Sequence, residues 1–222
     1  MPEIPDGISI VLLTGRFVVV DKPAGLLSVP GKGEANQDCV ARRVAAAFPE
    51  ARGPLIVHRL DMATSGLLVL ALDPLAHRSL SMAFERRAVS KRYEALLGGD
   101  VSPLGREGEI DVPIRTDITR RPLQIVDDVH GKPSRTRWIL RGIHDGPSGT
   151  RSRVEFEPIT GRTHQLRLHS ATATPRGLGC PIVGDDLYGG EPATRLMLHA
   201  SDLCFPDPET GAEVRVRSET PF

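Results

Sequence analysis

The sequence predicts a single α+β domain built on a mixed, largely antiparallel β-sheet with flanking helices. Apolar runs of strand length recur along the chain, whereas only three segments show helical spacing or a helix start. The strands do not alternate regularly with long helices, which argues against a doubly wound fold. At 222 residues the chain can bury one core without disulfides. It has no repeat or linker, so we expect one domain over residues 1–222.

Strands and two helices make up the first part of the chain. Three apolar runs of strand length are Ile8–Leu12, Phe17–Val20 and Leu67–Leu72. Cys39–Phe48 places its apolar side chains on one face at helical spacing and predicts a helix. Asp73 followed by Pro74 is typical of a second helix start, because Asp caps free N–H groups and Pro suits the first turn.

The second part of the chain is richer in strands. Five further strands are predicted at Lys91–Leu97, Arg135–Ile143, Ser152–Pro158, Leu196–Ala200 and Glu213–Arg217. Residues 98–134 are rich in Gly, Pro and charge and predict a long loop or hairpin excursion, a feature that is usually functional. Thr160–His169 is expected to begin a helix, with Leu166 facing inward.

The charge distribution leaves the partner open. The chain has 28 basic and 28 acidic residues, and nucleic-acid-binding domains are usually basic. Its basic residues are nevertheless clustered. The two clusters are Arg86, Arg87, Lys91 and Arg92, and Arg115, Arg120, Arg121, Lys132, Arg135 and Arg137. Local basic stripes of this kind can hold RNA with an affinity that falls as salt rises.

Cysteine usage and the apolar segments predict a cytoplasmic protein. The three cysteines are widely spaced, form no CxxC pair and are typical of reduced thiols. The N-terminus lacks the apolar core of a signal peptide, and no stretch has the length of a membrane helix.

The segment His58–Gly66 carries the strongest chemical signal. Charged side chains run through small polar residues into the buried strand at Leu67–Leu72. A carboxylate such as Asp61, held on a loop by a rigid scaffold, is well placed for chemistry. The alternative is an ordinary loop ion pair between Arg59 and Asp61. Lys22, in an earlier turn, is interpreted either as a phosphate contact or as a solvated lysine.

Several segments together resemble the RluA-type RNA pseudouridine synthases, from Val18 to about Phe222. They are Val18–Gly31, His58–Gly66, Lys91–Tyr93, Arg121–Gln124, Gly131–Pro133, Thr160–His169 and Leu198–Ala200. The chain is most similar to the branch that modifies both tRNA anticodon stem-loops and large-subunit ribosomal RNA, and we expect no separate N-terminal RNA-binding domain of the kind that many relatives carry. It departs from the pattern in a longer segment at 170–180 and in Asp186, where a basic residue is common. Both departures bear on target choice.

The resemblance implies that Asp61 is the catalytic aspartate. The reaction breaks the C1′–N1 bond of a uridine, turns the uracil and rejoins it through C5. A carboxylate serves as a nucleophile at C1′ or as a base at C2′, and both routes stay open. Arg167 is implied as the partner of Asp61, Tyr93 as the residue that stacks on the base, and Leu198 as an apolar wall of the pocket. Because the reaction is an isomerisation, no metal or organic cofactor is expected.

The resemblance also implies RNA contacts. Arg59 is expected to fill the space that the flipped base leaves, and base flipping costs a few kcal/mol. Arg121 and Lys132 are expected to grip the RNA backbone, and Arg162 and His164 to contact phosphate. The expected partner is tRNA, 23S ribosomal RNA or both, with no membrane and no obligate protein partner, so that the chain acts as a monomer.

Two other functions are compatible with parts of the sequence. The first is a metal hydrolase that uses His58, Asp61, His164 and His169. The two later histidines are five residues apart, which does not place them squarely on one helix face, and no HExxH motif or cysteine cluster supports a metal site. The second is an RNA-binding module without activity, which has no need to keep Asp61, Tyr93 and Arg167 together.

Overall fold

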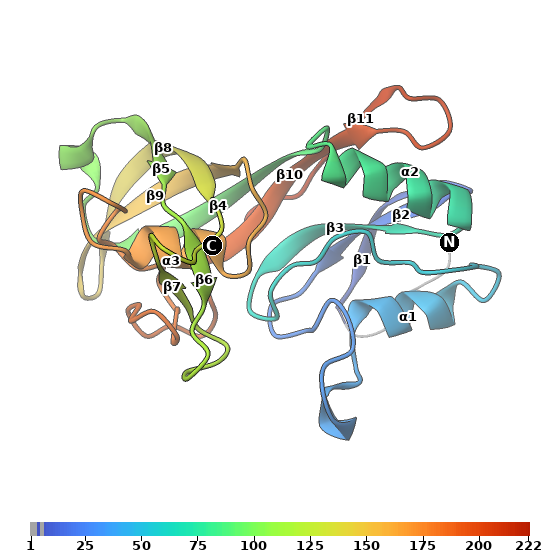
Figure 1. The fold of residues 1–222 in the computed structure, drawn as a ribbon, viewed down its shortest axis with the longest axis horizontal. Helices are drawn as coiled ribbons and strands as arrows, with labels where there is room; N and C mark the ends of the chain where they lie inside the picture. The colour runs from blue at the N-terminus through green and yellow to red at the C-terminus, as the bar shows by residue number, and fades with distance from the viewer. Residues whose placement is uncertain (1–3, 5–6) are drawn as a thin grey trace. The chain divides into compact units, whose positions relative to one another are not determined.

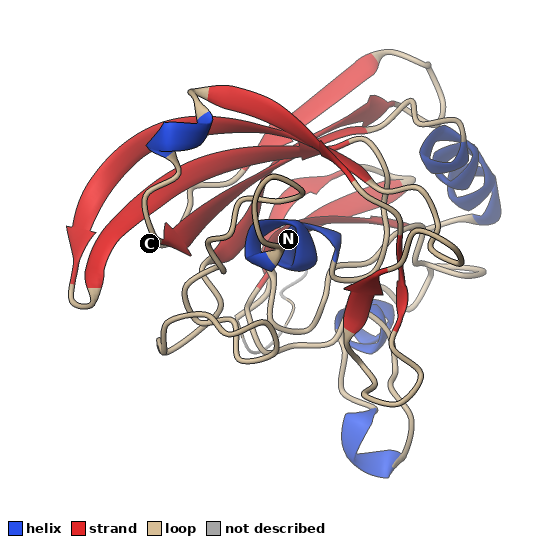
Figure 2. Cartoon of the chain, turned by 60° about the vertical axis from the view of Figure 1, so that its left-hand side comes forward, coloured by secondary structure: helices blue, strands red, loops and turns tan. Residues whose placement is uncertain are grey.

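The computed structural model describes Ile4 and residues 7–222, and it forms two compact units. The first unit comprises Met1–Lys91 and His199–Pro221, and the second comprises Arg92–Leu198 and Phe222. Strands make up most of the regular structure, and most of their pairings are antiparallel (Figure 2). The predicted fold class is therefore confirmed. Within the described residues, no helix is long and apolar enough to cross a membrane.

The first unit contains the sheet whose strand β3 (Ser65–Ala71) directly follows the loop with Asp61. Its strands follow the order β1 (Ser9–Leu13), β2 (Phe17–Lys22), β3 (Ser65–Ala71), β10 (Leu198–Pro206) and β11 (Glu213–Arg217). All pairings are antiparallel except that of β3 with β10, which is parallel. The predictions for the last two strands of this sheet had different outcomes. β11 is confirmed, whereas β10 starts two residues later than predicted and continues to Pro206.

Two helices, α1 (Val40–Ala47) and α2 (Pro74–Glu85), cover opposite faces of this sheet (Figure 1). The period-2 alternation of β2 sends Phe17 toward the core that contains Leu80 of α2. Asp73 caps α2 as predicted, because its Oδ1 accepts hydrogen bonds from the N–H groups of the first turn at 2.8 and 2.9 Å.

In the second unit four strands form an antiparallel sheet. Their order is β4 (Ser90–Gly98), β9 (Gly149–Pro158), β8 (Arg135–Gly146) and β5 (Glu107–Asp111). The strands predicted at β4, β8 and β9 are confirmed, and β8 and β9 extend further than predicted into one long hairpin (Figure 2).

The predicted excursion at 98–134 contains more regular structure than a loop. Besides β5 it holds a separate two-stranded hairpin, β6 (Ile114–Thr116) with β7 (Gln124–Val126), drawn in yellow-green in Figure 1. Two short 3-10 helices complete the elements found in the described residues. They are η1 (Glu34–Asn36) and η2 (Ser102–Leu104).

The predicted helix at Thr160–His169 is wrong in its start. Helix α3 spans Gln165–Ala171 and buries Leu166 as expected. His164, just before it, has a left-handed backbone with φ 53°, which keeps the helix from starting earlier in the chain. The Gln165 side chain accepts hydrogen bonds from Thr160 Oγ1 at 2.7 Å and Arg162 N at 3.0 Å and so fixes this segment as a loop.

Candidate functional site

Asp61 lies in the loop that leads into β3, as predicted. It is half-buried, and its carbonyl oxygen accepts a hydrogen bond from Thr64 N at 3.1 Å, which closes a tight turn. The buried strand β3 follows directly, with every residue from Ser65 to Ala71 buried. The carboxylate therefore projects from a short turn that the core strand anchors.

Two buried side chains hold the residues on either side of Asp61. Ser28 Oγ donates to Leu60 O at 2.8 Å and accepts from Leu60 N at 3.1 Å. Lys22 Nζ donates to Met62 O at 3.1 Å, and Gly25 N donates to the same oxygen at 2.8 Å. Both peptide neighbours of Asp61 are thus fixed to the segment that follows β2, and the Cα of Asp61 is confined between them.

Both interpretations of Lys22 from the sequence are wrong. Its side chain is completely buried, and Nζ also donates to Pro23 O at 2.9 Å and Leu26 O at 2.8 Å. An ammonium donates three hydrogen bonds, and these three carbonyl oxygens match its three donors. Lys22 is therefore a tie between the turn at residues 23–26 and the Asp61 loop.

His58 anchors the start of the loop as a neutral ring. Its Nε2 accepts a hydrogen bond from Val69 N at 3.1 Å, and the ring stacks on Phe84 at 4.5 Å between centroids. Removal from water lowers the pKa of His58 to about 3, and the positive charge of Lys91 adds to this. Protonation would put an N–H against the Val69 N–H, so this contact needs the neutral form.

The low pKa of His58 predicts a pH-dependent stability. The folded pKa of about 3 lies below the ordinary 6.5, so the unfolded chain binds more protons between these values. The free energy of unfolding is therefore expected to fall as the pH drops from about 6.5 toward 3. Burial lowers the pKa of His169 to about 4 and acts in the same direction.

Urea denaturation at several pH values measures this dependence. His58→Gln, which removes the titrating ring, is expected to flatten the dependence, and the same change at the exposed His130 to leave it unaltered. Equal pH slopes for His58→Gln and the parent would contradict the assignment.

A chain of hydrogen bonds fixes the end of the loop. Ser218 Oγ donates to Asp21, so it accepts from His199 Nε2 at 3.1 Å, and His199 Nδ1 accepts from Ser65 Oγ at 2.8 Å. Gly66, with φ 114°, passes so close to β10 that a Cβ would clash with the backbone oxygen of Ala200. The start of β3 is thereby locked to β2, β10 and the segment after β11.

Tyr93 and Leu198 belong to the second unit, whereas Asp61 belongs to the first. Tyr93 is buried in β4 opposite Phe156 of β9, and Leu198 is buried at the start of β10. Their meeting with Asp61 at one site stays a prediction.

Arg167 makes a buried ion pair that the sequence did not reveal. Its Nε and Nη2 donate to the two carboxylate oxygens of Asp185 at 2.8 and 2.5 Å. Arg167 is 3% exposed and Asp185 is fully buried, so each charge depends on the other. Asp186, the residue that departs from the family pattern, is 87% exposed and lies 3.7 Å from the same guanidinium. The predicted pairing of Arg167 with Asp61 stays a prediction.

The predicted RNA-contacting residues of the second unit differ in their surroundings. Arg121, at the tip of the β6–β7 hairpin, and Lys132 are exposed, and neither forms an ion pair within the described part of the chain. Arg162 is half-buried and its Nε donates to Pro133 O at 3.1 Å. His164 is buried, and its Nδ1 lies 3.0 Å from the Tyr188 hydroxyl.

Most other arginines of the expected basic stripe are paired with acids. Arg115 contacts Asp127 at 2.5 Å, and Arg120 contacts Asp117 at 2.8 Å. Arg135 pairs with Glu109 and Asp111 of β5. Arg137 pairs with Glu109 of β5 and with Glu157 of β9. The stripe is therefore largely paired, and Arg121 and Lys132 are its exposed cations outside the ion pairs of the described residues.

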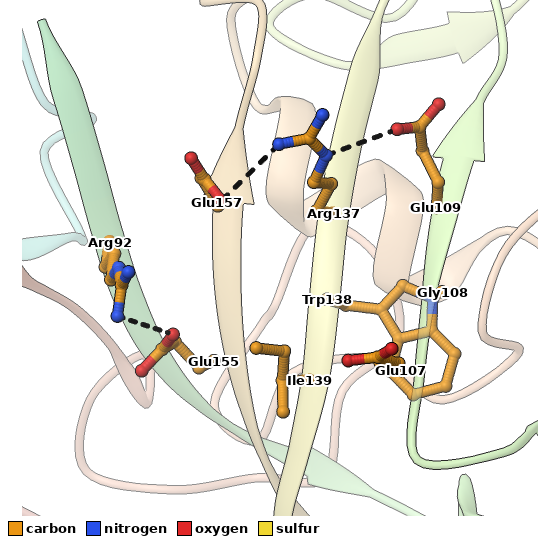
Figure 3. A pocket seen from close by; sticks show the side chains of 9 residues that line it. All are labelled: Arg92, Glu107, Gly108, Glu109, Arg137, Trp138, Ile139, Glu155 and Glu157. Atoms are coloured by element: carbon orange, nitrogen blue, oxygen red, sulfur yellow. Dashed lines mark ion pairs between the residues drawn. The ribbon is translucent and has the colours of Figure 1, made fainter.

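A pocket of about 370 Å³ lies on the four-stranded sheet of the second unit. Four glutamates contribute to its lining, and Figure 3 shows Arg92 paired with Glu155 and Arg137 paired with Glu109 and Glu157. The glutamates outnumber the arginines, so this pocket does not suit a polyanion.

The histidines of the metal-hydrolase alternative have other contacts. Besides the contacts of His58 and His164 given above, His169 Nε2 lies 3.0 Å from Ser134 Oγ. Among the described residues, no three His, Cys, Asp or Glu side chains gather in a way that could hold a metal ion. The geometry gives this alternative no support.

Comparison with known proteins agrees with the motifs. Residues 16–172 match the model of the RNA pseudouridylate synthase family. The proteins named "Dual-specificity RNA pseudouridine synthase RluA" from Yersinia pestis and Escherichia coli K12 are 41% and 40% identical over 211 residues. This alignment covers 93% of this chain and 96% and 90% of theirs.

A solved structure gives the same result. The human RNA pseudouridylate synthase domain containing 1 superposes with a TM-score of 0.79 and 31% identity, covering 97% of this chain and 84% of that one. The chain therefore belongs to the RluA-type RNA pseudouridine synthases, isomerases that act on RNA.

Proposed function

We propose that this chain converts uridines to pseudouridines in both tRNA anticodon stem-loops and 23S ribosomal RNA, with Asp61 as the catalytic carboxylate. The observation that carries the proposal is the double anchoring of the Asp61 loop by Lys22 and Ser28. A reacting group held on both sides keeps its geometry without reorganisation when the substrate binds. The names of the bacterial relatives support two classes of RNA substrate.

The proposed reaction needs one carboxylate. Asp61 attacks C1′ or removes the C2′ proton, the glycosidic bond to N1 breaks, and the uracil turns within the pocket. A new bond then forms between C5 and C1′ as the bond from Asp61 to C1′ breaks or, on the other route, as the proton returns to C2′. C5 loses its proton and N1 takes one up, so the product is an isomer of the substrate. Tyr93 stacks on the uracil, Arg59 takes its place in the RNA stack, and no water is consumed. We further propose that this chain is a single domain and that it acts as a monomer in the cytoplasm.

Tritium release from RNA that carries 5-tritiated uridine tests the proposal, because formation of the C5 bond frees that proton. Purified tRNA and ribosomal RNA are assayed separately. Release from both RNAs is the expected result. Release from only one would reduce the proposal to a single substrate class, and release from neither would contradict it.

The ion-pair pattern predicts which basic residues contribute to RNA binding. Binding to RNA is expected to weaken with salt, and each phosphate contact adds about 0.7 to the logarithmic slope for a single strand. Arg121→Ala and Lys132→Ala are each expected to lower the slope by about this amount. Arg137→Ala removes a cation that acids already neutralise, so it is expected to leave the slope unchanged.

Filter binding at four or more salt concentrations measures these slopes. If Arg137→Ala lowered the slope as much as Arg121→Ala does, the distinction between cations inside and outside ion pairs would be wrong.

A further inference from the structure

Tyr188 joins two parts of the second unit that have separate proposed roles. Its hydroxyl accepts a hydrogen bond from Gln124 N, the first residue of β7, at 2.8 Å. The same oxygen lies 3.0 Å from His164 Nδ1. The Arg167 guanidinium carbon lies 5.4 Å from the centroid of the Tyr188 ring. One side chain thus contacts the β6–β7 hairpin, the residue before α3, and Arg167.

The hydroxyl is suited to hold both of its partners at once. Because its oxygen accepts the Gln124 proton, its own proton is available to His164 Nδ1. Gln124 is 7% exposed and lies three residues after Arg121, so the bond fixes the end of the loop that carries this arginine. Phenylalanine would keep the ring next to Arg167 and remove only the two hydrogen bonds of the hydroxyl.

Asp185 completes the connection. Besides its two bonds to Arg167, its Oδ1 accepts from Leu187 N at 3.1 Å and Tyr188 N at 3.2 Å. The carboxylate that orients Arg167 therefore also fixes the backbone of Tyr188. A shift of Tyr188 would move the acceptor to which Arg167 is bound.

We propose that Tyr188 is a positioning residue that couples the β6–β7 hairpin to Arg167. When Arg121 contacts RNA, the position of the hairpin becomes fixed. Through its contacts with the hairpin, Tyr188 then fixes the position of the Asp185–Arg167 pair. This inference rests on the RNA contact proposed above for Arg121 and on the expected role of Arg167 as the partner of Asp61. RNA engagement at the hairpin then sets the reaction rate as well as the affinity.

A double-mutant cycle in single-turnover tritium release, with the tRNA and ribosomal RNA of the assay above, tests the coupling. Tyr188→Phe, which removes both hydrogen bonds of the hydroxyl, is expected to slow the reaction at saturating enzyme about tenfold and to change the Kd for RNA less than about threefold. Arg121→Ala is expected to weaken binding in both backgrounds, but to slow the saturated reaction only where Tyr188 is intact. Arg59→Ala, in the other unit, is the control and should slow both backgrounds by the same factor.

Equal slowing of the saturated reaction by Arg121→Ala in the two backgrounds would overturn the coupling. So would the absence of any slowing by Arg121→Ala in the parent, because the coupling requires it. A purely structural role of Tyr188 would lower the melting temperature of Tyr188→Phe without producing this dependence on Arg121.

Amide hydrogen exchange supplies a readout that needs no turnover and stands even if neither RNA releases tritium. Addition of unlabelled tRNA is expected to slow exchange at Leu187 N, which Asp185 holds, in the parent but not in Tyr188→Phe. Tyr188→Phe alone is expected to speed exchange at Gln124 N. Equal protection of Leu187 by RNA in both proteins, or protection in neither, would overturn the inference.

Discussion

Asp61→Asn is expected to reduce tritium release by about a thousandfold or more while RNA affinity changes less than about tenfold. Asparagine has nearly the same shape but cannot act as a nucleophile or accept a proton at its nitrogen, and acid–base groups contribute about 10²–10⁴-fold. The bonds that hold this loop come from Lys22 and Ser28 to the backbone, so they survive the substitution. Single-turnover release and filter binding measure the two quantities.

Asp38→Asn is the matched control. Asp38 lies in the same unit, is 62% exposed and pairs with Arg43 at 2.6 Å. The same change of charge there is expected to leave both turnover and binding near those of the parent. Turnover of Asp61→Asn within tenfold of the parent would refute the catalytic role.

Arg167→Ala is expected to lower the free energy of unfolding by about 3–5 kcal/mol, because it leaves the charge of Asp185 buried without a partner. It is also expected to abolish turnover if the guanidinium serves the reaction. Urea denaturation and tritium release measure the two effects. Arg176→Ala is the control for stability: it breaks a pair with Asp128 of the same 2.5 Å length at 45% and 66% exposure. An exposed pair contributes about 0–1 kcal/mol.

A second variant separates stability from catalysis. Arg167→Met combined with Asp185→Asn buries no charge, and the asparagine oxygen can still accept from Leu187 N and Tyr188 N. It is expected to regain most of the lost stability and none of the activity. Recovery of activity in this double variant would show that Arg167 acts on structure alone.

Local pattern was sufficient to predict most elements. β2, β3 and α2 follow from apolar spacing and from the Asp73–Pro74 cap. The start of α3 could not be read in this way, because the Gln165 side chain turns back to bind the segment before it. Nor could the end of β10, where Asp202 and Pro206 interrupt the apolar pattern and pairing with β11 sustains the strand.

In the candidate site, too, local features could be predicted from the sequence, whereas contacts between distant residues could not. The loop position of Asp61 was predicted because the motif runs directly into an apolar strand. Lys22 was misjudged because one of its acceptors, Met62 O, lies 40 residues further along the chain. Asp185 and Tyr188 were missed for a similar reason: their partners are 18 residues away at Arg167 and 64 residues away at Gln124. The Asp21-Lys22-Pro23-Ala24-Gly25 segment, which matches the family, was the one available signal for Lys22.

The anchored Asp61 loop bears on how targets are selected. A loop tied at Leu60 and Met62, and locked again at Ser65, has little freedom to adapt to its substrate. In the proposed reaction the distortion therefore falls on the nucleic acid, and the energy of unstacking the uridine becomes a property of the RNA. Uridines in loops, which are already weakly stacked, are favoured over those within continuous helices. Such a site selects uridines by how easily they unstack before it selects them by the neighbouring sequence. One rigid site of this kind can then act on unrelated RNAs that share a deformable loop.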